Sequence, residues 1–255
     1  MKSFYLLFLA ATLLLVSCNS ENAWNCVQTT GTIQTDTIVV PEFEKITVLH
    51  RSQLIVKTGD EPQVLLKTGK NLKNDVNISV VNGTLLIDNT NACNTIRDYG
   101  VTQVIVTTHT LTEIRNASGL PVLSEGVLDF PNLTLRSDDL VEEDFYHKTG
   151  DFELSLNCTN LKIETNGKSN FYLDGFAKNT EINFLDGDNR CECNLLKMDT
   201  AQIFHRGTND IFIAPNQSVT GELRSIGNLV LSQQVPVMEV KSFYTGKVII
   251  RSKSD

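Results

Sequence analysis

Glycine recurs at a fixed interval in the second half of the chain, and this spacing constrains the fold more than any other feature. The segments GKSNFYL, GDNRCEC, GTNDIFI and GNLVL begin at Gly167, Gly187, Gly207 and Gly227, at intervals of 20 residues, and GKVII follows 19 residues later at Gly246. Each segment joins a turn to a short strand-like run. A repeated unit of this length is typical of a solenoid, in which every unit forms one coil stacked on the last.

The rest of the chain after residue 30 also has the pattern of β structure. Segments such as TDTIVV, SQLIVKT and TQVIVTT are rich in β-branched residues, and no long stretch has helical periodicity. We therefore predict an all-β protein with a right-handed parallel β-helix (β-solenoid) over residues 108–255. An N-terminal cap of β-hairpins over residues 31–107 would cover the open end of the stack, within one domain of residues 31–255. Two domains, with a β-sandwich before Thr108, are the alternative.

The first residues have the pattern of an export signal. Lys2 precedes an apolar run over Phe4–Val16, which at 13 residues is too short to span a bilayer as a helix. The run leads into LVSC, where bacterial lipoprotein signals are cut before a cysteine that then receives lipid. We expect residues 1–17 to be a lipoprotein signal peptide, Cys18 to be the lipidated anchor and polar residues 18–30 to be a flexible tether. An ordinary signal with a stray cysteine, or an uncleaved anchor, is the alternative.

The chain without this signal is acidic. Loss of the signal removes one basic and no acidic residue, which leaves 21 basic against 30 acidic residues and a net charge of about −9. Nucleic acid is therefore not an expected partner, and no basic amphipathic helix is present for a membrane surface. We expect membrane contact through lipid on Cys18 and a location in the cell envelope at the outer membrane. The sequence leaves open the periplasmic or the cell-surface face.

Two cysteines one residue apart, Cys191 and Cys193, raise the question of a metal or redox site. The repeat places Cys191 between Phe171 and Ile211 of the neighbouring coils, and Cys193 at the next inward position. Apolar neighbours supply no further metal ligands, and side chains two residues apart on a strand are too distant for an easy disulfide. We predict buried, reduced thiols that pack as small apolar side chains.

The other cysteines fall into two groups. Cys158 follows three apolar residues at strict alternation, so we expect a core thiol. Cys26 and Cys93 lie outside the glycine-framed strands. Because exported proteins can keep disulfides, a bridge between Cys26 and Cys93 is as plausible as two free thiols.

The charged turn DGDNR contains Asp186, Asp188 and Arg190, a spacing that also occurs in calcium sites and acid–base pairs. In the repeat, Arg190 is in register with Asn170 and Asp210. We therefore expect a ladder of side-chain hydrogen bonds and an ion pair between Arg190 and Asp210, rather than a catalytic site.

No other motif supports catalysis or a cofactor. The four histidines are scattered, and the sequence contains no H-E-x-x-H, G-x-S-x-G, P-loop or dinucleotide-binding motif. We expect no catalytic residues, no metal and no cofactor. The acidic segment SDDLVEEDFYHKTG, residues 137–150, could bind a cation or a partner, although a solvated loop is the preferred interpretation. The triplets DTI and DTA match a short O-glycosylation pattern of exported Bacteroides-like proteins and make Thr37 and Thr200 candidate sites.

Several segments, in their order along the chain, carry a family resemblance. They are PEFEKITVLHRSQLIVKTGDEPQV, VVNGTLLID, LTEIRNASG and GTNDIFIAPNQSVTGELRSIGNLVLSQQVPVMEV. From about Ile38 to the C-terminus the sequence resembles the lipoproteins of Bacteroidota that carry the head GIN domain, an auto-transporter adhesin family. The resemblance implies a β-solenoid on the cell envelope and supplies no catalytic residues.

Two classes of function remain. The preferred one is a non-catalytic cell-envelope lipoprotein that presents a β-solenoid surface for adhesion or for binding a protein or glycan partner; the alternative is a glycan-active β-helix enzyme, a polysaccharide lyase or hydrolase. Outward residues Tyr172, Glu192 and Phe212 share one register in the repeat. We expect an exposed column in which Tyr172 and Phe212 stack on sugar or peptide, with packing of the column against a loop or its own neighbours as the alternative.

Overall fold

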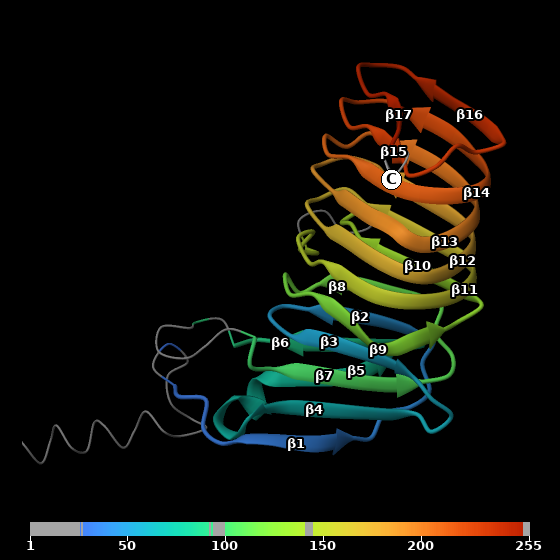
Figure 1. Cartoon of the computed structure of the whole chain (residues 1–255). Helices are drawn as coiled ribbons and strands as arrows, with labels where there is room; N and C mark the ends of the chain where they lie inside the picture. Colours follow the sequence, from blue (N-terminus) through green and yellow to red (C-terminus); the bar gives the residue numbers. More distant parts are fainter. Residues whose placement is uncertain (1–25, 27, 92, 94–99, 141–144, 252–255) are drawn as a thin grey trace, which may run out of the picture.

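The computed structural model describes residues 26, 28–91, 93, 100–140 and 145–251 (Figure 1). Within these residues the fold is all β, and the strands form a 17-stranded sheet. The strands of the first half are β1 (Ile33–Ile38), β2 (Lys45–Leu49), β3 (Gln53–Thr58), β4 (Gln63–Gly69), β5 (Val76–Val81), β6 (Thr84–Asn89), β7 (Gln103–Thr108), β8 (Glu113–Ala117), β9 (Val122–Asp129) and β10 (Asn132–Ser137). Those of the second half are β11 (Phe152–Thr165), β12 (Asn170–Phe184), β13 (Arg190–His205), β14 (Ile211–Leu223), β15 (Leu229–Leu231), β16 (Val237–Ser242) and β17 (Val248–Ile250).

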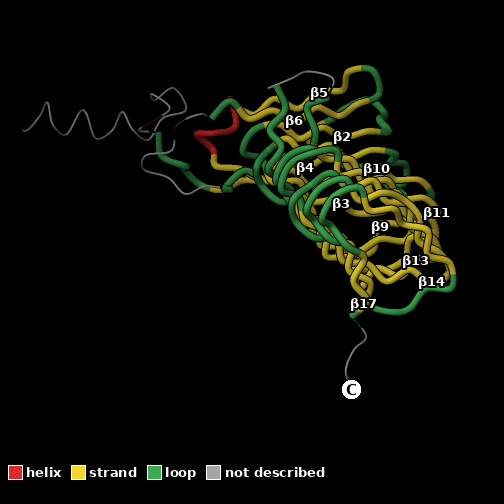
Figure 2. The backbone as a smooth tube through the Cα atoms, turned by 90° about the horizontal axis from the view of Figure 1, so that it is seen from above, coloured by secondary structure: helices red, strands yellow, loops and turns green. Residues whose placement is uncertain are grey.

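The long strands of the second half pair in parallel with the strand one repeat later. β11 pairs with β12, β12 with β13 and β13 with β14, and the partners of Cys191 are Phe171 and Ile211. This is the register that the glycine spacing predicts. Figure 1 shows the strands rising in chain order from β11 to β17, and Figure 2 shows the same stack from above.

The repeated glycines lie where successive turns approach one another closely. Gly187 has a φ of +86°, a conformation that favours glycine. A Cβ atom at this position would overlap the carbonyl oxygen of Gly167, one repeat earlier, and a Cβ atom at Gly246 would overlap that of Gly227. The 20-residue period therefore marks the places where backbone packs on backbone at one margin of the stack.

Antiparallel strands lie at the N-terminal end of the described chain. β1 pairs antiparallel with β4, and β4 pairs antiparallel with β7 (Figure 1). β5 and β6 form a hairpin whose turn residues Asn82 and Gly83 both have positive φ, 51° and 73°, as a two-residue type I′ turn requires.

The parallel stack begins earlier than residue 108. β2 pairs in parallel with β6 and β8, and β3 pairs in parallel with β7 and β9. Strands expected only in hairpins thus belong to the same parallel stack as the later repeats. Alternating apolar residues indicate a strand and its buried face but not its partner, so sequence pattern alone could not distinguish these pairings.

Alternate side chains of the stacked strands fill a common interior. A hydrophobic cluster of the described residues extends from Phe43 to Val235. Phe152 and Phe171 stack face to face with ring centroids 5.0 Å apart, and Phe184 packs beside Phe171 at 6.1 Å. Complete burial of a side chain of this size stabilises a fold by about 1.5–3 kcal/mol. In the part of the chain described, no helix has the length and apolar character to cross a membrane.

Candidate functional site

The expected column of outward residues is present in the strand register. Tyr172 of β12 pairs with Glu192 of β13, and Glu192 pairs with Phe212 of β14. The same register continues backward to Glu153 of β11, which is the partner of Tyr172. Four side chains from successive strands therefore lie side by side on one face of the stack.

The two aromatic residues of this column differ in exposure. Tyr172 is 44% exposed, whereas Phe212 is only 9% exposed. The guanidinium of Arg190 lies over the Phe212 ring, with Cζ 4.5 Å from the ring centroid, and also forms an ion pair with Glu192. The expectation that Phe212 is an exposed contact residue is therefore wrong. A long cationic side chain one strand away covers the ring, which an alignment of strand positions alone does not reveal.

A β-bulge in β13 reshapes the surface beside Tyr172. Tyr172 pairs with Glu192, but Asp174 pairs with Leu195, so β13 holds one extra residue between these pairs. The spacing between partners changes from 20 residues at Phe171 and Cys191 to 21 residues later along the strands. The extra residue rotates Leu195 outward, where it is 78% exposed, while the next residue is buried.

Tyr172 and Leu195 both line an open groove of about 810 Å³. Carboxylates line it on three successive strands: Glu153 of β11, Asp174 of β12 and Glu192 of β13. Glu153 and Asp174 are exposed, whereas Glu192 is half-buried beside its cationic partner. Aromatic and aliphatic surface beside hydrogen-bond acceptors suits a ligand that has an apolar face together with hydroxyl or basic groups.

A second pocket, of about 660 Å³, lies beside the connection from β1 to β2. Buried Phe43 and Val64 form part of its wall, and exposed His109 stands at its edge. Of the candidate site residues named in the sequence analysis it includes Thr37, a candidate for O-glycosylation, but neither of the expected partner-binding residues Tyr172 and Phe212. The groove at Tyr172 is therefore the better-supported candidate site.

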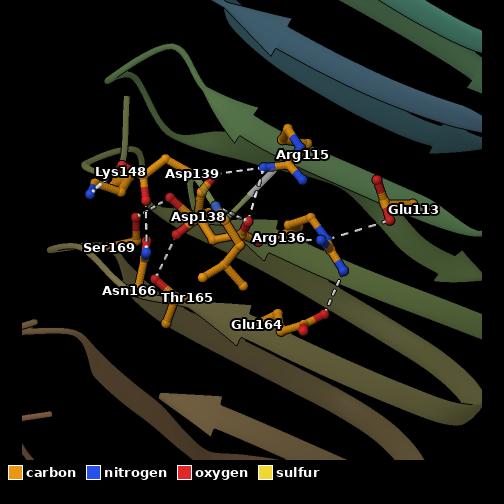
Figure 3. A network of polar contacts seen from close by, with 12 residues as sticks. Glu113, Arg115, Arg136, Asp138, Asp139, Lys148, Glu164, Thr165, Asn166 and Ser169 are labelled. Carbon is orange, nitrogen blue, oxygen red and sulfur yellow. Dashed lines mark hydrogen bonds and ion pairs between the residues drawn. The ribbon is translucent and has the colours of Figure 1, made fainter. Parts of the chain in front are cut away.

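The acidic segment after β10 is held against the stack (Figure 3). The side chain of Asp138 is fully buried, and Arg115 Nη1 lies 3.4 Å from its Oδ1 and donates to its backbone oxygen at 2.6 Å. Arg136 Nε lies 3.6 Å from Asp138 Oδ2, and Arg136 Nη2 donates to Glu164 at 2.6 Å. These contacts anchor the start of the segment, so for Asp138 the expectation of a solvated loop is wrong.

Asp139 is also part of this network. Lys148 Nζ lies 2.6 Å from Asp139 Oδ2, and the Asn166 side-chain amide donates to Asp139 Oδ1 at 2.7 Å (Figure 3). Arg115 further stacks on the ring of Tyr146, with Cζ 4.4 Å from its centroid. Basic and amide partners thus balance the carboxylates of Asp138 and Asp139, which gives the network a structural role. Acidic residues 141–144 lie outside the described residues.

The charged turn DGDNR forms local contacts, but not the expected ion pair. Arg190 binds Glu192 on its own strand, and its Nη1 donates to Asn209 at 3.1 Å, whereas Asp210 accepts hydrogen bonds from Asn228. The expected pairing of Arg190 with Asp210 is therefore wrong, because a partner two residues along the same strand is nearer. Across the same turn, Thr208 donates to Asp188 at 2.7 Å, and Arg206 lies 3.7 Å from Asp186.

The described cysteines occupy two environments. Cys26 and Cys93 are joined by a disulfide, with Cα atoms 4.5 Å apart. Cys158, Cys191 and Cys193 are buried, as expected for core positions. The sulfur atoms of Cys191 and Cys193 lie 2.7 Å apart, so the expectation that these side chains are well separated is wrong.

Burial changes the acidity of two of these thiols and of one histidine. Desolvation raises the pKa of Cys158 to about 11 and raises that of Cys191 well above its ordinary value. Desolvation lowers the pKa of His205, whose Nε2 contacts the backbone oxygen of Asn209 at 2.9 Å. His205 packs edge-on against Phe184 in the core, with ring centroids 5.5 Å apart. These groups are structural in position, because each faces the interior.

The remaining sequence candidates are dispersed. Thr37 is exposed on β1, and Thr200 is half-buried on β13, where its hydroxyl donates to Asn179 at 3.1 Å. Cys18 lies outside the described residues. Within the described ranges, no three histidine, cysteine, aspartate or glutamate side chains gather as metal ligands would.

Leu195, Glu153 and Asp174 were not expected from the sequence as groove residues, whereas Glu192 was expected in the outward column. The glycine intervals remain 20 residues across the bulge, because the segment that connects β13 to the next glycine is one residue shorter. A local signal was nevertheless present. The consecutive pair Leu195 and Leu196 interrupts the alternation that begins at Cys191, and two adjacent apolar residues cannot both face the core of a regular strand.

Comparison with solved structures identifies proteins with a similar fold. A putative adhesin from Bacteroides fragilis is 16% identical, with a TM-score of 0.74 over 87% of this chain and 99% of that chain. A putative adhesin from Parabacteroides merdae is 14% identical, with a TM-score of 0.59 over 87% and 98% of the two chains. A putative lipid binding protein from Parabacteroides distasonis is 11% identical, with a TM-score of 0.60 over the same shares.

Comparison with curated proteins gave no match. Comparison with protein families gave a match over residues 42–234 to the family described as "Putative auto-transporter adhesin, head GIN domain". This range is more than half of the chain and contains the bulge, the groove and the Asp138 network. The chain therefore belongs to this head GIN domain family.

Proposed function

We propose that this chain is a non-catalytic lipoprotein of the cell envelope that binds a protein or glycan partner through the groove beside Tyr172. The observation that carries the proposal is the placement of Tyr172 and Leu195, both exposed, in one groove that is also lined by acidic residues of three successive strands. A tyrosine ring offers a flat surface to a sugar or peptide, and neighbouring carboxylates accept hydrogen bonds from hydroxyl or ammonium groups.

The architecture proposed for this role is a right-handed parallel β-helix. Parallel pairing at intervals of about 20 residues, and backbone contacts between successive glycine turns, support it. In this proposal residues 31–107 include the cap, residues 108–255 continue the coils, and the whole of residues 31–255 is one domain. A rigid stack of this kind presents an extended surface whose side chains repeat at the strand spacing of about 4.8 Å.

The envelope location rests on three features. The family and two of the three similar structures described above bear putative adhesin names, the first residues have the pattern of a lipoprotein signal, and the disulfide between Cys26 and Cys93 suits an oxidising compartment. We place the anchor on lipid at Cys18, at the outer membrane. Cys18→Ala should move the protein from the membrane to the soluble fraction, and a variant that stays with the membrane would disprove this anchor.

The binding role is tested by comparing wild type with Tyr172→Ala, Leu195→Ala and the double variant on a glycan array and in pull-downs from envelope extract. Tyr244→Ala is the matched control, because Tyr244 is 67% exposed and does not line the groove. We expect a partner that the groove variants lose at least tenfold and the control retains. A partner bound equally by all variants would remove the groove from the proposal.

The non-catalytic part of the proposal has a separate test. The purified protein is incubated with the polysaccharides that the array identifies, and reducing ends and unsaturated products are measured over time. We expect no product above that of a heat-inactivated sample. Cleavage that disappears in Asp186→Asn or Asp188→Asn would show a glycan-active enzyme.

A further inference from the structure

We propose that Cys191 and Cys193 form a disulfide within β13 in the exported protein. The two sulfur atoms lie 2.7 Å apart in the interior of the stack. Non-bonded carbon atoms pack at about 3.5–4.0 Å, and sulfur is the larger atom, so this contact is too close for two thiols that merely pack together. This inference concerns the interior of the strand and does not depend on the proposed binding role.

The local backbone brings the two side chains together. Residues two apart in a regular strand have Cα atoms about 6.4–6.8 Å apart, at the upper limit of about 6.8 Å for disulfides. β13 is not regular here: its register shifts relative to β12 after Glu192 and relative to β14 after Cys193. A bulge bends its strand, and the pair lies at the point where the bend begins.

Each of the two sulfur atoms has the other as its hydrogen-bond partner in an apolar part of the core. Cys191 and Cys193 are 0% and 1% exposed, and their strand partners are the apolar residues Phe171, Ile211 and Ile213. A thiol is a weak hydrogen-bond donor and a weak acceptor. A disulfide removes two poorly satisfied polar groups from this apolar layer, whereas a pair of thiols would retain both.

Burial of the two cysteines indicates when, relative to folding, they can be oxidised. In the folded chain, desolvation and the neighbouring Cys193 raise the pKa of Cys191, which suppresses the thiolate needed for exchange. Oxidation should therefore take place before β13 is enclosed by its neighbours. The bridge between Cys26 and Cys93 provides independent support for passage through an oxidising compartment.

The reaction proposed is thiol–disulfide exchange with a protein disulfide donor of the exported compartment. The thiolate of one cysteine attacks the donor disulfide and forms a mixed disulfide, and one donor thiolate leaves. The thiolate of the second cysteine then displaces the other donor sulfur. Cys191 and Cys193 together lose two protons and two electrons, and the donor is released as a dithiol.

Tryptic mapping tests the bond directly. The exported full-length protein is unfolded in guanidinium with iodoacetamide and without reductant, then digested. Cleavage after Arg190 and Lys197 releases the peptide CECNLLK, which contains both cysteines. We expect this peptide to carry no alkyl group and to be lighter by two hydrogens than the dithiol. Two alkyl groups on the peptide would overturn the proposal.

Two controls make the result decisive. The peptide Thr149–Lys162 contains Cys158 alone and should carry one alkyl group in the same digest, which shows that the reagent reached core thiols. In Cys193→Ser, the peptide that contains Cys191 should gain one alkyl group. A Cys191 that stays unmodified in this variant would show that its partner is another group, and the assignment to Cys193 would be wrong.

Discussion

The guanidinium of Arg190 lies over the ring of Phe212 on the next strand, with Cζ 4.5 Å from the ring centroid. The same guanidinium donates from Nε to Glu192 at 2.7 Å and from Nη1 to Asn209 at 3.1 Å. Arg190 thus joins two strands and a turn, and it hides an aromatic side chain that the strand register directs outward. Neither Arg190 nor Phe212 lines the candidate groove, and the covered Phe212 ring is not available to a ligand.

Replacing Arg190 with alanine should destabilise the fold by about 1–2 kcal/mol. A partly desolvated cation–π contact contributes about 0.5–2 kcal/mol, and a partly exposed ion pair adds up to about 1 kcal/mol. Urea denaturation provides the measurement. Arg206→Ala is the control, because Arg206 forms only a loose, exposed pair with Asp186 at 3.7 Å and should change stability by less than about 0.5 kcal/mol. Equal losses in the two variants would argue against the ring contact.

Asp138→Asn should cost about 3 kcal/mol, at the low end of the range for breaking a buried charge pair. The substitution leaves the guanidinium of Arg115 without its carboxylate in a site where the Asp138 side chain is 0% exposed, while Arg136 keeps Glu164. The midpoint of urea denaturation should fall with no change in slope. Glu125→Gln removes an exposed pair with Lys57 and should change stability by less than about 1 kcal/mol. A similar shift in both variants would contradict a structural network.

The sequence predicted the structure best at positions where a single physical requirement explains the residue type. Glycine at 167, 187 and 227 marks turns whose backbones approach too closely for a side chain, so its interval indicated the strand register of Cys191 and its partners. Alternation of apolar residues likewise identified Phe171 as a core residue. Both signals arise from local geometry that any sequence must satisfy to fold in this way.

The remaining features of the fold and of the candidate site depend on contacts between strands and turns, which local sequence patterns do not specify. These features are the parallel partners of β2 and β3, the burial of Asp138 and the stacking of Arg190 on Phe212. Each involves residues that come together only in the folded chain. The groove depends on one extra residue in β13, which the constant glycine interval conceals. The candidate site was therefore only partly predictable: Tyr172 was identified, whereas Leu195 was not.

The stability difference between wild type and Cys158→Ala should change between about pH 9 and pH 11. Burial raises the pKa of Cys158 from 9.0 to about 11. The unfolded chain therefore loses this proton at a lower pH than the folded chain, so the stabilising contribution is complete below about pH 9 and is lost as the pH rises through about 11. Urea denaturation at several pH values should show wild type losing more stability than Cys158→Ala over this window. Parallel curves for the two proteins would contradict the raised pKa.

Gly187→Ala should destabilise the fold more than Gly126→Ala, although the two glycines have nearly the same φ, +86° and +81°. Alanine in this left-handed region costs about 1 kcal/mol at either position. Only at Gly187 would the new Cβ also overlap the carbonyl oxygen of Gly167, whereas a Cβ at Gly126 meets no atom within 4 Å. We expect a loss of about 1 kcal/mol for Gly126→Ala and at least about 3 kcal/mol for Gly187→Ala, because the backbones of two successive turns must separate. Urea denaturation of the two variants measures the difference directly, and equal losses would show that the turns do not need glycine for close packing.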